Sequence, residues 1–188
     1  MRSTIMIAIL FSMALWANAQ DLGKVSIALQ SEAIGFPFSN YAPIHPGAEV
    51  GLTIRERHRA RSSTAVNVYF GGYYHERIAT GLYLRAEFQP TLKLGNHFGL
   101  LLPMGVGYLH TFYPAELYQV NDEGSFEVAR QGGRPHALLQ LGVGISYLGH
   151  ERFEPFIKQE LAIETPFANT FPFIPHSFIK AGLAINLN

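Results

Sequence analysis

Apolar and polar residues alternate at every second position through much of this chain. The alternation is clearest in residues 80–94, where every second side chain is apolar and the positions between include Arg85 and Glu87. Successive side chains of a strand point to opposite faces, so this segment predicts a strand with one apolar and one charged face. It is longer than the about 9–11 residues that a tilted strand needs to cross a bilayer.

Eight segments of this kind follow one another, at residues 25–30, 49–55, 66–73, 82–94, 98–108, 137–147, 157–164 and 179–187. Glycines gather on the polar face, where we expect them to leave room for tyrosines inside a narrow eight-stranded barrel. The connections are short on one side and mostly longer on the other, at 36–46, 75–79, 113–134 and 167–175. Outer-membrane barrels have this asymmetry, with short periplasmic turns and long external loops.

The start of the chain has the features of a cleavable signal peptide, residues 1–19. Arg2 supplies the positive charge, residues 5–15 the apolar run and residues 17–19 the small-x-small cleavage site. Residues 20–188 would then form one domain. This domain has no apolar run as long as a membrane-spanning helix, so a membrane-bound form would have to be a closed barrel.

Composition narrows the function classes. The chain has no cysteine, so it has neither a disulfide framework nor a lipobox cysteine for a lipid anchor. Its 14 basic residues balance its 14 acidic residues, which leaves no overall positive field for nucleic acid. We therefore expect no nucleic-acid partner.

The alternating segments and the connection lengths resemble those of the small, porin-like or adhesin-like bacterial outer-membrane β-barrels. The resemblance covers residues 25–188. It implies an all-β, closed, antiparallel, up-and-down transmembrane β-barrel of eight strands, exported through a Sec-type signal peptide to the outer membrane and surrounded by its lipids. By resemblance, such proteins are envelope structural elements, adhesion or resistance factors, narrow channels or lipid-modifying enzymes.

Nine charged residues fall on the predicted inner face, at Glu49, Arg55, Arg85, Glu87, Lys93, Lys158, Glu160, Glu164 and Lys180. Buried charges must be paired, so we expect ion pairs across the lumen, including Lys180 with Glu160 or Glu164. This predicts a non-enzymatic structural or surface-interaction protein with a narrow lumen filled by salt bridges. A small pore for ions or small solutes is the alternative if water passes. A soluble barrel that binds a ligand would need an apolar inner face instead.

A lipid-modifying hydrolase is the second alternative, and it would need a Ser or Thr nucleophile, a His base and a carboxylate. His176-Ser177 is the nearest hint, but adjacent strand residues point to opposite faces, and Ser146 has no inward histidine at its level. We therefore predict no catalytic residue and no cofactor. The external loops 36–46 and 113–134 are where we expect an extracellular ligand or envelope partner to bind.

Five histidines fall at or near the predicted external end, namely His45, His75, His110, His136 and His176. None has the spacing of a known ligand motif, and no cysteine could assist them. We expect these histidines to be exposed at the membrane interface or in loops, and we predict no metal ligand.

Overall fold

The structure, a computed structural model, describes residues 23–37, 41–76, 78–113, 118–120, 125–128, 133–166 and 172–187. The predicted signal peptide and parts of both predicted binding loops lie outside these residues. The strands are β1 (Lys24–Ile34), β2 (His45–His58), β3 (Ser62–Tyr73), β4 (Thr80–Leu94), β5 (Phe98–Leu101), β6 (Met104–Phe112), β7 (Tyr118–Val120), β8 (Phe126–Val128), β9 (Arg134–Tyr147), β10 (Phe153–Thr165) and β11 (Ile174–Asn186).

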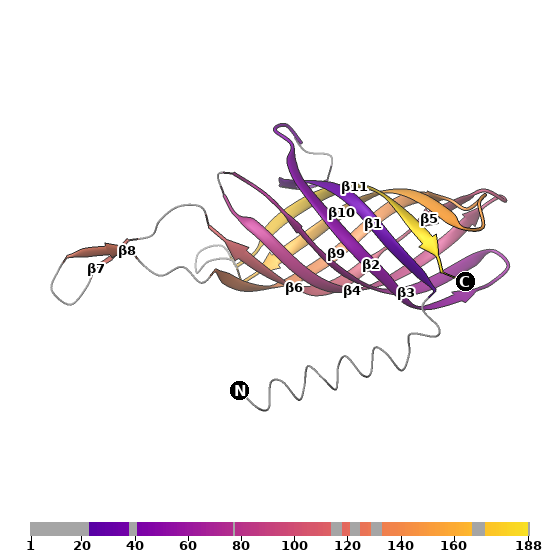
Figure 1. Cartoon of the computed structure of the whole chain (residues 1–188), viewed down its shortest axis with the longest axis horizontal. Coiled ribbons are helices and arrows are strands. Elements are labelled where there is room, and N and C mark those ends of the chain that lie inside the picture. The colour runs from indigo at the N-terminus through magenta and orange to yellow at the C-terminus, as the bar shows by residue number, and fades with distance from the viewer. Residues whose placement is uncertain are drawn as a thin grey trace, which may run out of the picture.

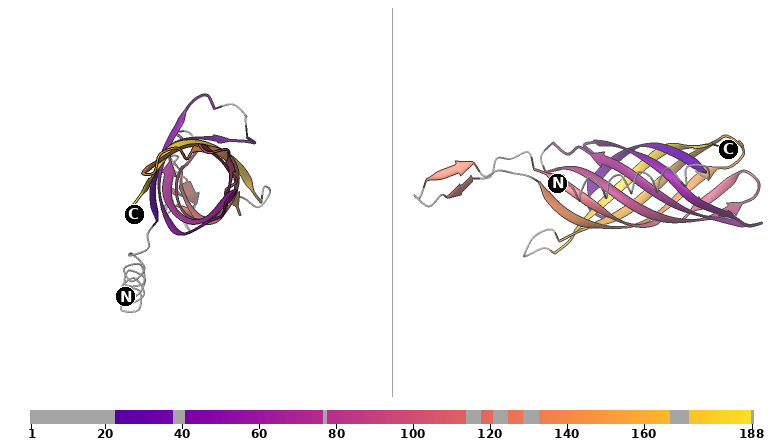
Figure 2. Two further views of the ribbon diagram at one scale, coloured as in Figure 1. Left: turned by 90° about the vertical axis from the view of Figure 1, so that its right-hand side faces the viewer. Right: turned by 60° about the horizontal axis from the view of Figure 1, so that its bottom comes forward.

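Antiparallel pairing closes the sheet into a barrel (Figures 1 and 2). β1 pairs with β2 on one side and with β11 on the other, where Lys24 lies opposite Asn186. The remaining neighbours follow in chain order, so the first and last strands complete the ring. The predicted closed, antiparallel, eight-stranded barrel is confirmed.

β5 and β6 occupy one of the eight strand positions, and they are separated only by Leu102 and Pro103. Both pair with β4 and with β9 without a shift in register. The interruption falls at Pro103 because proline has no backbone N–H to donate to the ladder. The carbonyl of Pro103 still accepts from Gly142 N at 2.8 Å.

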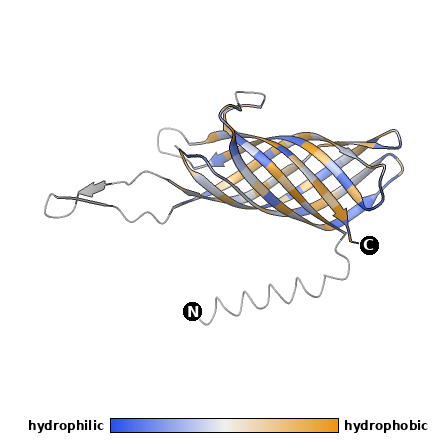
Figure 3. Cartoon of the chain, turned by 45° about the horizontal axis from the view of Figure 1, so that its top comes forward, coloured by the Kyte–Doolittle hydropathy of each residue, from blue (hydrophilic) through white to orange (hydrophobic). Residues whose placement is uncertain are grey.

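The barrel is apolar outside and polar inside, as the alternating colours along its strands show (Figure 3). Leu29 and Ile157 on the outer wall are 71% and 61% exposed, whereas Arg85 inside is 2% exposed. A soluble barrel has the opposite distribution, because water would contact its outer wall. The outer wall is therefore suited to hydrocarbon, as in membrane barrels.

No helix in the described part of the chain is long and apolar enough to cross a membrane.

The two ends of the barrel differ in their connections. Residues 59–61, 95–97 and 148–152 join strands at what we call the short-turn end, on the right in Figure 1. The other connections lie at the long-loop end, where β7 and β8 pair as a separate two-stranded sheet beyond the barrel.

One inner-face prediction is wrong, because Arg55 has an exposed side chain. A β-bulge is the cause: Thr53 pairs with Asn67 and Arg55 with Val66, so β2 carries one extra residue. The extra residue reverses the alternation beyond it. Glu56 consequently takes the inward place and meets Lys24 Nζ at 3.1 Å.

Candidate functional site

Six charged side chains meet at mid-height inside the barrel, and we call them the central cluster. Each is at most 2% exposed, and three are cations and three are carboxylates. They come from β2, β4, β10 and β11, and they are Arg85, Lys158, Lys180, Glu49, Glu87 and Glu160. Residues two apart on a strand share a face, which explains why Arg85 and Glu87 both point inward.

Arg85 is the centre of the cluster. Its Nη2 lies 2.7 Å from Glu49 Oε2, and its Nη1 donates to Glu87 and to Gln140 Oε1, the latter at 2.7 Å. The guanidinium also lies 4.3 Å from the centre of the Tyr69 ring. A planar guanidinium with several donors suits this position, because one cation contacts partners from three strands.

The two lysines complete the pairing. Their Cα atoms face each other across β10 and β11, where like charges are unfavourable. Lys180 Nζ is drawn to Glu160 Oε2 at 2.6 Å and to Glu49 Oε2 at 2.7 Å. Lys158 Nζ instead lies 3.4 Å from Glu87 Oε1. The six charges balance, and their near-complete burial closes the lumen at this level.

Glycine on the inner face makes room for these contacts. A Cβ at Gly71 would lie 2.7 Å from the hydroxyl oxygen of Tyr83, too close for any real side chain. Tyr83 can therefore lie across the lumen and donate its hydroxyl to Glu49 Oε2 at 2.8 Å. This agrees with the expectation that inward glycines leave space for tyrosines.

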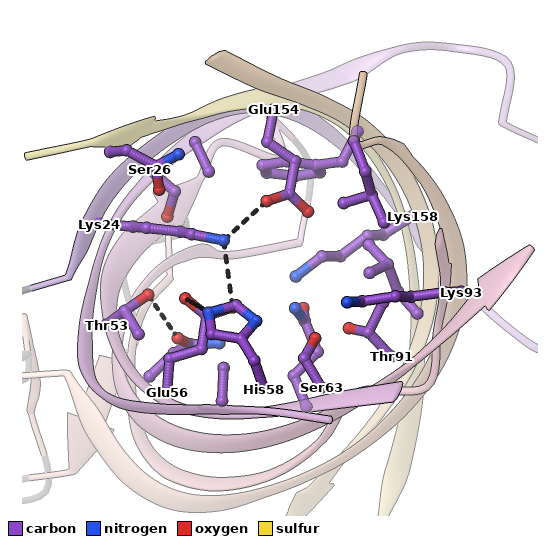
Figure 4. Close-up of a pocket in the computed structure, with 18 of the residues that line it drawn as sticks. Lys24, Ser26, Thr53, Glu56, His58, Ser63, Thr91, Lys93, Glu154 and Lys158 are labelled. Atoms are coloured by element: carbon purple, nitrogen blue, oxygen red, sulfur yellow. Dashed lines mark hydrogen bonds and ion pairs between the residues drawn. The ribbon is translucent and has the colours of Figure 1, made fainter. Parts of the chain in front are cut away.

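A polar vestibule of about 240 Å³ lies between the central cluster and the short-turn end (Figure 4). Lys24 reaches into it and pairs with Glu56 at 3.1 Å and with Glu154 at 2.8 Å. Lys93 also lines it, and its Nζ donates to the carbonyl of Arg59 at 3.3 Å. The vestibule is thus a polar recess whose lining extends inward to Lys158 of the central cluster.

A second group of titratable side chains lies toward the long-loop end, and we call it the histidine–glutamate cluster. Its members are Glu32, His45, His75, His136, Glu164 and His176.

His176 connects the two carboxylates of this cluster. Its Nδ1 lies 2.8 Å from Glu32 Oε1, and its Nε2 lies 2.9 Å from Glu164 Oε2. An ionised carboxylate only accepts hydrogen bonds, so the ring must carry a proton on both nitrogens to donate to both. This geometry therefore requires an imidazolium at His176.

His136 lies between a hydroxyl and a carboxylate. Its Nδ1 lies 2.7 Å from the carbonyl oxygen of Pro166 and 3.1 Å from Glu164 Oε1, and its Nε2 lies 2.9 Å from Thr111 Oγ1. Because a carbonyl only accepts, Nδ1 carries the proton and a neutral ring would accept from Thr111 at Nε2. This is the order of groups in a nucleophile–base–carboxylate triad, although Thr111 is only 1% exposed.

His45 and His75 meet at the rim. His45 lies opposite Glu32 across β1 and β2, and its Nδ1 donates to the Glu32 carbonyl at 3.0 Å. Tyr74 N donates to Pro46 O at 2.9 Å, which carries the next residue, His75, to the same level. The two rings stack with centroids 3.6 Å apart. Burial, followed by the neighbouring His45, lowers the pKa of His75 below its usual value.

No family model matches this chain, and no curated protein matches it. Among solved structures, Neisserial surface protein A (NspA) matches with a TM-score of 0.51 at 9% identity, covering 87% of this chain and 95% of that one. The chain has the fold of a small outer-membrane β-barrel. Ail of Yersinia pestis (13% identity, 87% and 99% coverage, TM-score 0.45) and the outer-membrane enzyme PagL (10%, 85% and 97%, 0.47) are also similar. At such identities the likeness concerns the fold alone.

The nine predicted inner charges fall into four groups. Six form the central cluster, and Glu164 belongs to the histidine–glutamate cluster. Lys93 lies near the rim of the vestibule, and Arg55 lies outside the barrel.

The expectation of exposed histidines is wrong for three of the five. His75, His136 and His176 are 9%, 4% and 4% exposed. Sequence reasoning also missed Glu32, which is fully buried. The alternation contained the signal for two of these, because Glu32 continues the inward positions of the first strand and His176 has the same parity as inward Lys180.

The His176-Ser177 pair does not form a catalytic dyad. Ser177 points away from the lumen side of the strand, where its Oγ lies 2.6 Å from Tyr41 OH and accepts from Gln159 Nε2 at 2.7 Å. These contacts leave Ser177 fully buried. They also give Gln159, a polar residue on the otherwise apolar face of β10, its partners.

Proposed function

We propose that this protein is an integral barrel of the bacterial outer membrane with a structural or surface-interaction role and a lumen closed by the central cluster. The observation that carries the proposal is the set of six paired charges, each at most 2% exposed, across the interior. Ion conduction needs a continuous path for water, and charged side chains set selectivity only where such a path exists. A filled interior favours a role at the outer surface over transport.

The orientation follows from the connections. With the short turns in the periplasm, as in other outer-membrane barrels, the long-loop end would face the exterior. Residues 36–46 and 113–134 would then present the binding surface, and the β7–β8 hairpin lies within the second of these segments. Loops held by a rigid scaffold commonly carry recognition. Export would use the predicted signal peptide, residues 1–19.

The decisive experiment is electrical recording from the purified barrel in planar lipid bilayers. We expect no discrete conductance steps, with insertion shown independently by the heat-dependent gel mobility typical of folded barrels. Steady, reproducible channels from the wild-type protein would contradict the closed lumen and favour the small pore. Surface binding is tested in parallel with cells expressing the barrel with and without residues 118–128, and loss of binding to host cells or envelope material is expected only for the deletion.

Ester hydrolysis is a second candidate function, favoured by the Thr111–His136–Glu164 arrangement. It ranks second because Thr111 is almost completely buried, so an acyl chain has no route to its hydroxyl. The test is release of fatty acid from lipid A or phospholipid in mixed micelles. The candidate requires activity that Thr111→Val abolishes and that Thr165→Val, a change at an exposed hydroxyl bonded to Pro172 O, retains. No release by the wild-type barrel would remove it.

A further inference from the structure

Three side chains at the long-loop rim have the composition of a transition-metal site. Glu32, His45 and His75 each offer one ligand atom, and these atoms all lie within 4.8 Å of one another. They come from three neighbouring segments, namely β1, the start of β2 and the residues after β3. Two imidazoles and a carboxylate suit Zn²⁺ and its neighbours, whereas Ca²⁺ and Mg²⁺ prefer oxygen ligands alone.

Two of the three side chains have buried polar atoms without a hydrogen bond. Glu32 is fully buried, and its Oε2 has no hydrogen-bond partner. His75 is 9% exposed, and its Nδ1 also has none. A buried polar atom without a partner costs about 1–3 kcal/mol, so two of them at one point require an explanation. A bound cation would satisfy both.

The surrounding contacts orient the ligands. His45 donates its Nδ1 proton to the Glu32 carbonyl, which leaves Nε2 unprotonated and able to bind a metal. Glu32 accepts from His176 through Oε1, which directs Oε2 away from that ring. Hydrogen bonds of this kind, from the far side of a ligand to a carbonyl or a charged partner, are the usual support of metal ligands. The lowered pKa of His75 also favours its neutral, ligating form.

Charge and space at this end also favour a cation. With His176 as the imidazolium, one of the carboxylate charges of Glu32 and Glu164 has no cationic partner within the described residues. Glu32 and His75 line a cavity of about 10 Å³, which is close to the space that one small guest needs. The side chain of His45 is 16% exposed, which gives an ion a route in from the loop side.

We propose that Glu32, His45 and His75 bind one divalent transition-metal ion of the Zn²⁺ class at the long-loop end of the lumen. The ion joins β1, β2 and the segment after β3 at the rim that carries the long loops. Three protein ligands leave a fourth position of a tetrahedral site for water or for a group from outside. The site does not depend on the closed lumen or on a surface-binding role, and it extends beyond both.

Calorimetric titration of the detergent-solubilised barrel with ZnCl₂ tests the proposal. The protein is purified without a histidine tag and stripped with a chelator. We expect one Zn²⁺ per chain in the wild type and at least tenfold weaker binding in each of Glu32→Gln, His45→Gln and His75→Gln. His58→Gln is the matched control, because His58 also faces a glutamate, Glu56 at 3.6 Å, but lies at the other end with 62% of its side chain exposed. It should bind Zn²⁺ as the wild type does.

Cobalt substitution gives a readout that does not depend on the variants. Co²⁺ bound to the wild-type barrel should show the intense visible absorption of a tetrahedral ion, and Cu²⁺ should show magnetic coupling to two imidazole nitrogens. Heat-dependent gel mobility identifies any variant that fails to fold, and the wild-type spectra then decide. The proposal is overturned by the absence of saturable Zn²⁺ binding, by binding that survives all three substitutions, or by spectra without two imidazoles.

Discussion

The central cluster and the histidine–glutamate cluster lie in the same lumen, one at mid-height and the other near the long-loop rim. The first contains three permanent cations and three carboxylates, joined by contacts such as Lys180–Glu160 at 2.6 Å. The second has two carboxylates and four histidines, of which the geometry of His176 alone requires a positive charge. Buried charge is therefore balanced in one region and left in excess in the other.

This difference separates two uses of a polar interior. A balanced set of buried charges holds strands together and has little left with which to bind a ligand, because its ions already have partners. A set with unpaired acceptors, such as Glu32 Oε2, is suited to a guest. The closed lumen and the metal site are thus consequences of charge balance at two levels of one barrel.

Removing the hub of the central cluster should have the largest effect. Arg85→Met leaves Glu49 and Glu87 without their shared cation, and breaking a buried pair in this way costs about 3–5 kcal/mol. Urea unfolding of the barrel in lipid vesicles measures the loss. Arg55→Met is the matched control, because the bulge places Arg55 outside, and its free energy of unfolding should stay at the wild-type value. Equal losses in the two variants would contradict the buried network.

A smaller effect is expected in the histidine–glutamate cluster. His176→Phe keeps a ring of similar shape but removes both donors, so Glu32 and Glu164 each lose a buried hydrogen bond. We expect the free energy of unfolding to fall by about 1–3 kcal/mol in the same urea assay. His58→Phe, at an exposed histidine of the other end, should leave it unchanged. No loss in His176→Phe would mean that this ring does not bridge the two carboxylates.

The smallest effect is expected at the vestibule. Lys24 pairs with Glu56 and Glu154, but these side chains are 15–17% exposed. Solvent screens such pairs, so Lys24→Met should cost about 1 kcal/mol or less, and raising the salt to 1 M should shrink the difference from wild type. The loss in Arg85→Met should hardly respond to salt, because that pair is buried. A salt-independent loss at Lys24 would remove the distinction between rim and interior.

Much of the barrel could be predicted because alternation has a period of two, which requires no knowledge of the fold. Arg85, Glu87 and Lys158 were placed inside because they fall between outward apolar residues. Arg55 failed the same rule, since a bulge inserts one residue and reverses the alternation beyond it. Nothing in the alternation of the predicted second strand indicates where such an insertion occurs.

The candidate site was harder to predict because its members are far apart in the chain. Glu32 and His176 are separated by 144 positions, yet their side chains make a 2.8 Å contact. Extending the alternation would have turned both inward, but not placed them at one level. The histidines were expected in loops because they fall near predicted strand ends, where side chains can point to solvent or into the barrel mouth.

The alternation by itself determined that eight strands close into a barrel with an apolar wall and a charged interior, because the side-chain period of a strand requires only local order. The tertiary structure alone decided which charges meet. Barrel closure and the stagger between strands set the height of each residue in the lumen, and those heights brought Arg85 to Glu49 and Glu32 to His45 and His75.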